Sequence, residues 1–123
     1  IGVENWGKGF RQSGDLAKAM KGVEQIPDRI LMSHDPTHWE EQVLAKEKIQ
    51  LTLSGHTHGM QMGFEIPWLG VKFSPARLRY QRWGGLYTEG EQHLHVNRGF
   101  GFLAFPGRVG MPPEITLLEL EKA

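Results

Sequence analysis

Two short apolar runs that each lead into a histidine constrain the fold of this chain more than any other feature. Residues 30–32 read Ile-Leu-Met and lead into His34, and residues 49–53 alternate apolar and polar side chains before His56. A continuous apolar run is typical of a parallel strand buried on both faces, whereas an alternating run is typical of a half-buried strand. The sequence therefore predicts two strands that both end in histidine.

A helix is predicted between these two strands. Asp35 is a good capping residue, and Pro36 suits the first helical position. Trp39 and Val43 have the spacing of a buried stripe, and lysines at positions 46 and 48 would complement the C-terminal end of a helix that reaches them. Strand, helix and strand in this order predict a βαβ unit.

The second strand runs into Gly55-His56-Thr57-His58-Gly59. Residues two apart on an extended backbone point the same way, so His56 and His58 are predicted to face one point in space. Neutral imidazole is the commonest metal ligand in proteins, and α/β proteins bind ligands at the carboxyl ends of their strands. Two histidines on a solvated strand face would give the same pattern, but His34 at the end of the neighbouring strand favours a metal site.

Composition narrows the class of protein. The chain has 123 residues, of which 39% are hydrophobic, with a formal net charge of zero and no cysteine. The length and apolar content suit one domain with one core. A net charge of zero gives no strong electrostatic attraction for nucleic acid, and the absence of cysteine excludes disulfides and thiolate metal sites. The sequence does not begin with methionine, and residues 1–5 resemble the middle of a strand. We therefore expect residues 1–123 to form a single, partial domain.

A basic and aromatic stretch in the middle of the chain admits two interpretations. Residues 66–88 include four cations and no acid, and Trp68, Phe73, Tyr80 and Trp83 lie among them. The plain interpretation is an irregular surface excursion that covers part of the core. The alternative is a lid that meets an anionic head group or a phosphate-bearing membrane surface.

The remaining elements are β-rich. Residues 86–88 and 92–97 predict a β-hairpin, and residues 115–120 predict a final strand. The hairpin contains a second pair of histidines, His93 and His95, which alternate with Leu94 and Val96. Alternation in the middle of a strand is typical of an exposed face opposite a buried one, so these two histidines are predicted to be structural.

Four blocks in one order carry a family resemblance. They are Ser-His-Asp-Pro at 33–36, Ser-Gly-His-Thr-His-Gly-Met-Gln at 54–61, Asn-Arg-Gly-Phe-Gly at 97–101 and Pro-Glu-Ile-Thr-Leu-Leu at 113–118. The chain resembles the C-terminal half of a calcineurin-like metallophosphoesterase, and most closely a bacterial branch of membrane-associated phosphodiesterases. Met60 replaces a glycine that is usual in that branch.

The resemblance implies an α/β fold, a β-sandwich flanked by helices in four layers. It also implies two divalent metal ions (Mn, Fe or Zn), with His34 and His56 on one ion and His58 on the other. Such a pair clamps phosphoryl oxygens and lowers the pKa of a bound water. Gln61 and Arg98 are candidate substrate-binding residues, although a loop hydrogen bond and a surface cation are equally good interpretations. The family's other ligands and its acid–base histidine belong to motifs that this sequence lacks, so no catalytic residue is assigned here.

Several expectations follow for the whole protein. The parent enzyme should hydrolyse a phosphoester or pyrophosphate bond in a small molecule or a lipid head group, and a membrane surface is a further candidate partner. The chain alone should be inactive, because its missing N-terminal partner supplies the other ligands. Two alternatives stay open: a non-catalytic interaction module on the same scaffold, and a structural subdomain that forms a homodimer. Nucleic acid is not an expected partner.

Overall fold

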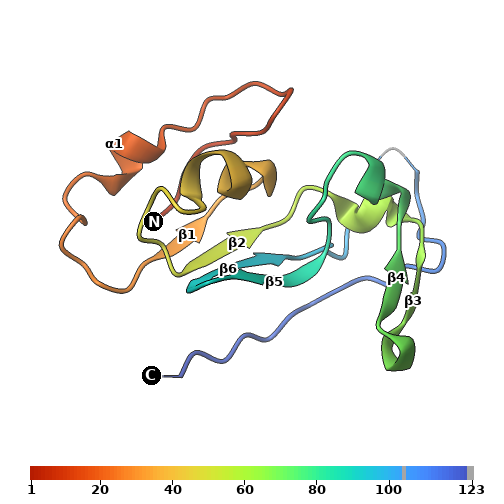
Figure 1. The fold of residues 1–123 in the computed structure, drawn as a ribbon. Coiled ribbons are helices and arrows are strands. Elements are labelled where there is room, and N and C mark those ends of the chain that lie inside the picture. Colours follow the sequence, from red (N-terminus) through yellow and green to blue (C-terminus); the bar gives the residue numbers. More distant parts are fainter. Residues whose placement is uncertain (104, 122–123) are drawn as a thin grey trace.

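A four-stranded mixed sheet forms the centre of the computed structural model, which describes residues 1–103 and 105–121. The strand order is β1 (Ile30–Met32), β2 (Leu51–Ser54), β6 (Gln92–Val96) and β5 (Gly85–Glu89) (Figure 1). The first three strands are parallel, and β5 is antiparallel to β6. The predicted α/β class is confirmed, as are the βαβ unit and the hairpin. The four-layer sandwich remains a prediction.

The helix between β1 and β2 is shorter than predicted. It includes the π-helical turn η1 (Trp39–Val43), which closes with a bond from the Leu44 amide to the Trp39 carbonyl at 2.8 Å. Trp39 and Val43 are fully buried, as their spacing predicted. The helix does not reach the lysines at 46 and 48, because Ala45 has a left-handed backbone with φ of 57° and turns the chain back towards β2.

One face of the sheet carries the main core. The short helix α1 (Leu16–Met20) begins at Asp15, whose carboxylate accepts a hydrogen bond from the Lys18 amide at 2.8 Å. It packs with η1 against the strands. The buried members of this core are Leu16, Met20, Leu31, Trp39, Val43, Ile49, Leu94 and Val96.

The opposite face of β1 is open, which corrects the prediction that this strand is buried on both faces. Leu31 is fully buried, whereas Ile30 and Met32 are 38% and 61% exposed. Both helices lie on the side of Leu31, and no helix or strand of the described residues covers the other side of β1. At the edge of the sheet, residues 1–5 contribute only a single bridge, between Gly2 and Met32.

The predicted strand at 115–120 is wrong. Residues 112–121 run as an extended segment with no strand assignment, and Ile115 and Leu117 are more than 80% exposed (Figure 1). An alternating apolar pattern specifies a strand only when a sheet edge pairs with it, and within the described residues this segment finds no such edge.

The stretch after the histidines forms a protruding hairpin, in agreement with the predicted irregular region with short strands. Strands β3 (Phe64–Ile66) and β4 (Val71–Phe73) pair antiparallel, with the turn η3 (Pro67–Leu69) at the tip. The turn η4 (Pro75–Leu78) then leads into a small second core of Ala76, Tyr80, Trp83 and Met111. No helix among the described residues is long and apolar enough to cross a membrane.

Candidate metal centre

His34 and His56 meet where β1 and β2 end. The Ser33 amide bonds the Leu53 carbonyl, and the Gly55 amide bonds the His34 carbonyl, both at 3.0 Å, so the two parallel strands stay paired beyond their last assigned residues. The Nε2 atom of His34 lies 3.0 Å from the Nδ1 atom of His56, and the ring centroids are 4.8 Å apart. The structure thus brings together two histidines that are 22 positions apart in the sequence.

The loop that carries the second and third histidines has an unusual backbone. Four non-glycine residues have left-handed φ values: His56 (66°), His58 (50°), Met60 (47°) and Gln61 (57°). For residues other than glycine this conformation costs about 1 kcal/mol or more of free energy, and residues that adopt it concentrate at functional sites. The turn η2 (His58–Gln61) is held by Thr57, whose hydroxyl donates to the Trp83 carbonyl at 2.7 Å.

Aromatic side chains from two distant segments surround the His56 ring. Phe10 and Tyr80 both make edge contacts with it, at centroid distances of 5.1 and 5.6 Å. Burial lowers the pKa of His56, as do the charges of His34, His58 and Arg79, while Asp35 opposes the shift. His56 is therefore a neutral imidazole near pH 7, the form that binds metals.

Asp35 lies on the far side of the same ring. Its side chain is 1% exposed, and its Oδ1 atom accepts bonds from the Thr37 amide at 2.8 Å and the Thr37 hydroxyl at 2.6 Å. This is the capping role that the sequence predicted. The other oxygen, Oδ2, has no hydrogen-bond partner among the described residues and lies 3.5 Å from His56 Nε2. The sequence pattern alone did not reveal this second contact, although the position of Asp35 beside His34 could have indicated it.

His58 lies two residues beyond His56. Its Nδ1 atom is buried and finds no hydrogen-bond partner within residues 1–103 and 105–121, and its carbonyl accepts a bond from Arg108 at 3.4 Å. Its charge is one of those that lower the pKa of His56, so the two rings are close enough to interact electrostatically. No hydrogen bond and no ring-to-ring contact joins His58 to His34 in the described part of the chain.

The second pair of histidines, His93 and His95, contacts other residues. His93 Nδ1 bonds the Thr88 hydroxyl at 2.9 Å, and His95 Nε2 lies 4.0 Å from a Glu114 oxygen. His95 is only 7% exposed, so the prediction of an exposed face is wrong at this position. The segment that contains Glu114 and Thr116 covers it, and burial lowers the pKa of its imidazole.

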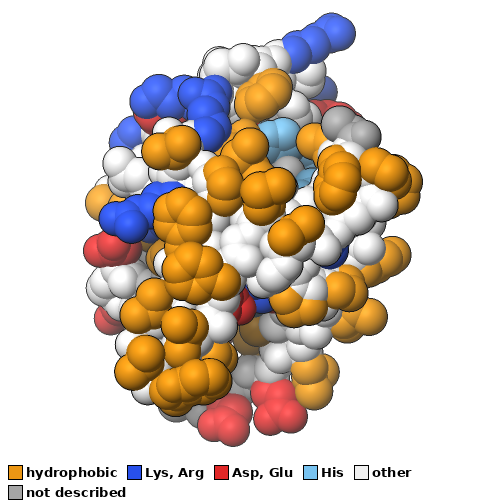
Figure 2. All heavy atoms as spheres, turned by 90° about the vertical axis from the view of Figure 1, so that its right-hand side faces the viewer, with side chains coloured by type: hydrophobic (Ala, Val, Ile, Leu, Met, Phe, Trp, Pro, Cys, Tyr) orange, Lys and Arg blue, Asp and Glu red, His pale blue; other side chains and the backbone are white. Residues whose placement is uncertain are grey.

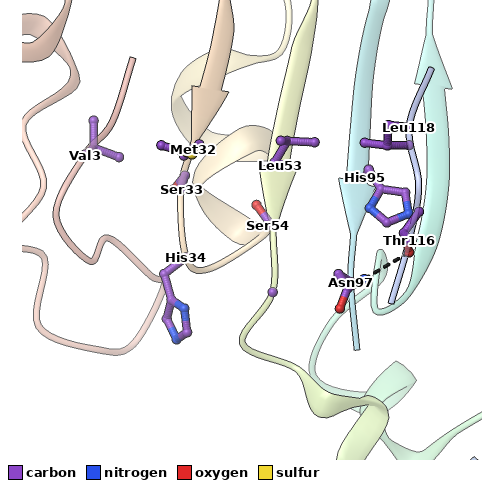
Figure 3. Close-up of a pocket in the computed structure, with 11 residues that line it drawn as sticks. Val3, Met32, Ser33, His34, Leu53, Ser54, His95, Asn97, Thr116 and Leu118 are labelled. Atoms are coloured by element: carbon purple, nitrogen blue, oxygen red, sulfur yellow. Dashed lines mark hydrogen bonds between the residues drawn. The ribbon is translucent and has the colours of Figure 1, made fainter. Parts of the chain in front are cut away.

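A cavity of about 440 Å³ opens at this end of the sheet. Figure 3 shows the His34 ring at one side of it and His95 at the other, with Leu53 and Ser54 of β2 between them. Asn97 and Thr116 close the His95 side through a hydrogen bond of 2.9 Å. Met32 and Leu118 also line the cavity, so its floor is the open, apolar face of β1 and β2.

Gln61 and Arg98 have structural partners. The Gln61 amide donates to the carbonyls of Phe105 and Gly107, both at 2.6 Å, and is 3% exposed. Arg98 pairs with Glu114 at 2.6 Å and Glu65 at 2.8 Å. These contacts favour the loop-supporting interpretation of Gln61, and they make Arg98 a largely buried cation between two carboxylates rather than a surface cation.

The facing nitrogens of His34 and His56 fit a single transition-metal ion. Two nitrogens bound to one tetrahedral zinc at 2.0–2.1 Å are about 3.3 Å apart, close to the separation found here. Two ligands do not complete a site, however. Within residues 1–103 and 105–121, no group of three or more His, Cys, Asp or Glu side chains is arranged to hold one ion.

Comparisons with known proteins find several that are similar in sequence to this chain. The chain is 38% identical over 113 residues to phosphodiesterase YaeI of Escherichia coli, covering 88% of this chain and 39% of that protein. It is 38% identical over 102 residues to the metallophosphoesterase YkuE of Bacillus subtilis, covering 80% of the chain and 34% of the relative. A bovine transmembrane protein with metallophosphoesterase domain is 33% identical over 110 residues, covering 89% of the chain and 23% of the relative.

The chain thus spans less than half the length of each of these relatives. No family model matches it, and no solved structure matches it significantly. The aligned regions nevertheless cover most of the chain, including both histidine-bearing strand ends, and the relatives agree in the activity that their names give. The chain belongs to the calcineurin-like metallophosphoesterase superfamily, a family of hydrolases.

Proposed function

We propose that the whole protein hydrolyses a phosphoester or pyrophosphate bond with two divalent metal ions, and that His34, His56 and His58 of this chain are ligands to them. One observation carries the proposal: His34 Nε2 and His56 Nδ1 face each other at 3.0 Å where two parallel strands end. The names of the relatives support the reaction class.

The residues of this chain hold and shield the proposed centre. The strand-end bonds fix His34 against His56, and the Thr57 hydroxyl fixes the loop that carries His58. Phe10 and Tyr80 cover His56 and limit the access of water to it. Metal ions of this kind supply charge stabilisation at phosphoryl oxygens and a nucleophile at neutral pH when they are bound.

A cation, Arg79, lies beside the proposed centre. The guanidinium of Arg79 sits 5.8 Å from the ring centroid of Phe10, which in turn contacts His56, and its charge acts on His56. We assign Arg79 the role of attracting the phosphate group of the substrate. Arg79 also donates a hydrogen bond to the Lys8 carbonyl. Two other cations of the predicted lid have acceptors elsewhere: Arg82 pairs with Glu40 and Glu89, each at 2.8 Å, and Lys72 bonds the Gly84 carbonyl at 2.5 Å.

A lipid head group or another phosphate-containing small molecule is the proposed substrate class. Hydrophobic side chains gather on the side of the β3–β4 hairpin, and histidine side chains reach the surface among them (Figure 2). Trp68, Leu69 and Leu78 are 83%, 65% and 94% exposed there. Exposed aromatic and aliphatic side chains beside basic ones suit the interface of a membrane with anionic lipids. A relative that is named a transmembrane protein agrees with this placement.

This chain alone is expected to be inactive. Its three proposed ligands are neutral imidazoles, which do not offset the repulsion between two divalent cations. Carboxylate ligands and a general acid from elsewhere in the whole protein are needed, and general acid–base catalysis typically contributes 10²–10⁴ in rate.

The test compares the full-length protein with the chain on a generic phosphodiester in the presence of manganese. We expect activity from the full-length protein only, and its loss by at least ~10²-fold in His34→Ala and His56→Ala. His93→Ala is the matched control, because His93 bonds Thr88 away from the centre. Full activity in His56→Ala would refute the proposal. Activity of the chain comparable with that of the full-length protein would show that it holds a complete ligand set.

A further inference from the structure

We propose that Asp35 is a positioning residue for His56: its free carboxylate oxygen accepts the Nε2 proton of the imidazole, which leaves Nδ1 unprotonated and directed at His34. The consequence for metal binding rests on the function proposed above, whereas the choice of tautomer does not.

The first observation is an unpaired oxygen on a buried carboxylate. Oδ1 of Asp35 already accepts two hydrogen bonds from Thr37, while Oδ2 accepts none. With a side chain only 1% exposed, this oxygen has no access to bulk water. Leaving a buried polar atom without a partner is energetically costly, so a donor at this position would be strongly favoured.

The second observation is that the two nitrogens of His56 have different neighbours. Nδ1 faces His34 Nε2 at 3.0 Å, and Nε2 faces Asp35 Oδ2 at 3.5 Å. A neutral imidazole has one donor and one acceptor nitrogen. A carboxylate only accepts, so the proton belongs on Nε2, and the lone pair then remains on Nδ1. The distance of 3.5 Å exceeds the 2.7–3.2 Å of an N–H···O bond, and a shift of a few tenths of an ångström closes it.

The backbone at Gly7 lies directly against this carboxylate. A Cβ atom at Gly7 would come within 2.3 Å of Asp35 Oδ2 and 2.8 Å of its Cγ. Glycine therefore leaves room for the carboxylate, and the close backbone leaves that carboxylate little freedom to move. The Gly7 backbone and the hydrogen bond from the Thr37 amide hold Asp35 in the orientation that presents Oδ2 to His56.

Two other roles for Asp35, helix capping and direct metal coordination, account for fewer of these observations. Helix capping uses only Oδ1, so it leaves Oδ2 unexplained. Direct coordination of the ion between the two histidines is disfavoured, because Asp35 and His34 approach opposite nitrogens of the same ring. A carboxylate that orients a metal-binding histidine through its second nitrogen is a common outer-shell arrangement, and its loss typically weakens metal binding by 10–100-fold.

The test reads the tautomer directly. Long-range ¹H–¹⁵N correlation spectra of the metal-free, full-length protein at pH 8, with histidines labelled in ¹⁵N, report which nitrogen of His56 carries the proton. We expect the Nε2–H form. Asp35→Asn presents an amide donor to Nε2 when its oxygen keeps the Thr37 bonds, and it should shift His56 to the Nδ1–H form.

Thr37→Val is the matched control, because it removes the hydroxyl bond to Oδ1 and leaves Oδ2 in place. It should leave the tautomer unchanged. A wild-type His56 that is mainly Nδ1–H overturns the proposal, and so does an unchanged tautomer in a folded Asp35→Asn protein. If that variant does not fold, the wild-type tautomer alone decides.

Zinc titration of the same proteins separates this inference from the proposed function. Asp35→Asn should weaken zinc binding by about 10–100-fold, and Thr37→Val should not. If the wild type shows the Nε2–H form but binds no zinc, the proposed metal centre fails and the positioning of His56 stands. If zinc binds equally well to the wild type and to folded Asp35→Asn, the positioning role is refuted.

Discussion

His34 Nε2 and His56 Nδ1 face each other at 3.0 Å, a separation at which two nitrogen lone pairs repel unless a proton or a cation lies between them. The two strands bring the rings this close through backbone bonds that do not involve the imidazoles. The fold therefore holds the two proposed ligands together before any ion arrives, which would reduce the entropic cost of binding one.

The first prediction concerns metal affinity. Replacing either His34 or His56 by alanine in the full-length protein should weaken zinc binding by more than about 100-fold, the upper end of what loss of an outer-shell partner costs. Isothermal titration with zinc measures this. His95→Ala should change the affinity little, because His95 lies against Glu114 on the other side of the cavity. Equal weakening in all three variants would point to unfolding instead of lost ligands.

The second prediction concerns Arg79, the cation beside the proposed centre. Arg79→Gln should raise KM for a phosphodiester by up to about fivefold with little change in kcat, because an exposed charge pair contributes up to ~1 kcal/mol. Steady-state kinetics at low and high salt measure this, and salt should reduce the difference. Lys21→Gln, an exposed cation just beyond α1, serves as the control.

The basic stretch as a whole has its own test. Replacing Arg77, Arg79 and Arg82 together should reduce both activity and liposome binding of the full-length protein. Unchanged activity and unchanged binding to anionic liposomes would show that this stretch is an ordinary surface excursion. Arg82 also pairs with Glu40 and Glu89, so a thermal melt must accompany the comparison.

The third prediction concerns Gly7. Gly7→Ala should lower the free energy of unfolding by about 1–3 kcal/mol, because a methyl group there overlaps the Asp35 carboxylate and forces it to move. Urea unfolding followed by tryptophan fluorescence measures the change. Gly101→Ala is the matched control, since a Cβ atom at that position meets no atom of the described residues within 4 Å.

The fourth prediction concerns the pH dependence of stability. His38 is fully buried between the Ser33 hydroxyl at 2.7 Å and the Gln42 side chain at 3.1 Å, and burial lowers its pKa. The unfolded chain therefore binds a proton first as the pH falls below about 6.5, the usual pKa of histidine. This contribution to stability is complete above that pH and declines below it, by at most about 1.4 kcal/mol per pH unit, until the lowered pKa is passed.

Urea unfolding between pH 8 and 5 measures this slope. Burial also lowers the pKa of His56 and His95, so their contributions have the same sign. His38→Gln should flatten the curve in part, and an equal slope in wild type and variant would contradict the assignment to His38.

The sequence predicted the βαβ unit and the meeting of His34 with His56 for a simple reason. Parallel neighbouring strands place their carboxyl ends at one edge, so strand ends that carry histidine converge whatever the loops do. The hairpin of β5 and β6 was predicted equally well from local alternation and turn residues.

Contacts made by irregular segments were not predictable in this way. Phe10 and Tyr80 reach His56 from loops that have no periodic pattern, and the covering of His95 depends on where residues 112–121 lie. The second role of Asp35 was missed because a capping residue is recognised from one oxygen, while the other oxygen faces a ring from a different strand.

The left-handed backbone of the histidine loop has a consequence for how this protein would evolve in the laboratory. Glycine adopts φ values of 47–66° at no steric cost, whereas His56, His58, Met60 and Gln61 each pay for them. In a library of variants selected only for heat resistance, glycine should accumulate at positions 56, 58 and 60. Variants with glycine at position 56 or 58 should lose the proposed metal binding. Only Met60, which is 56% exposed, should become glycine without loss of function.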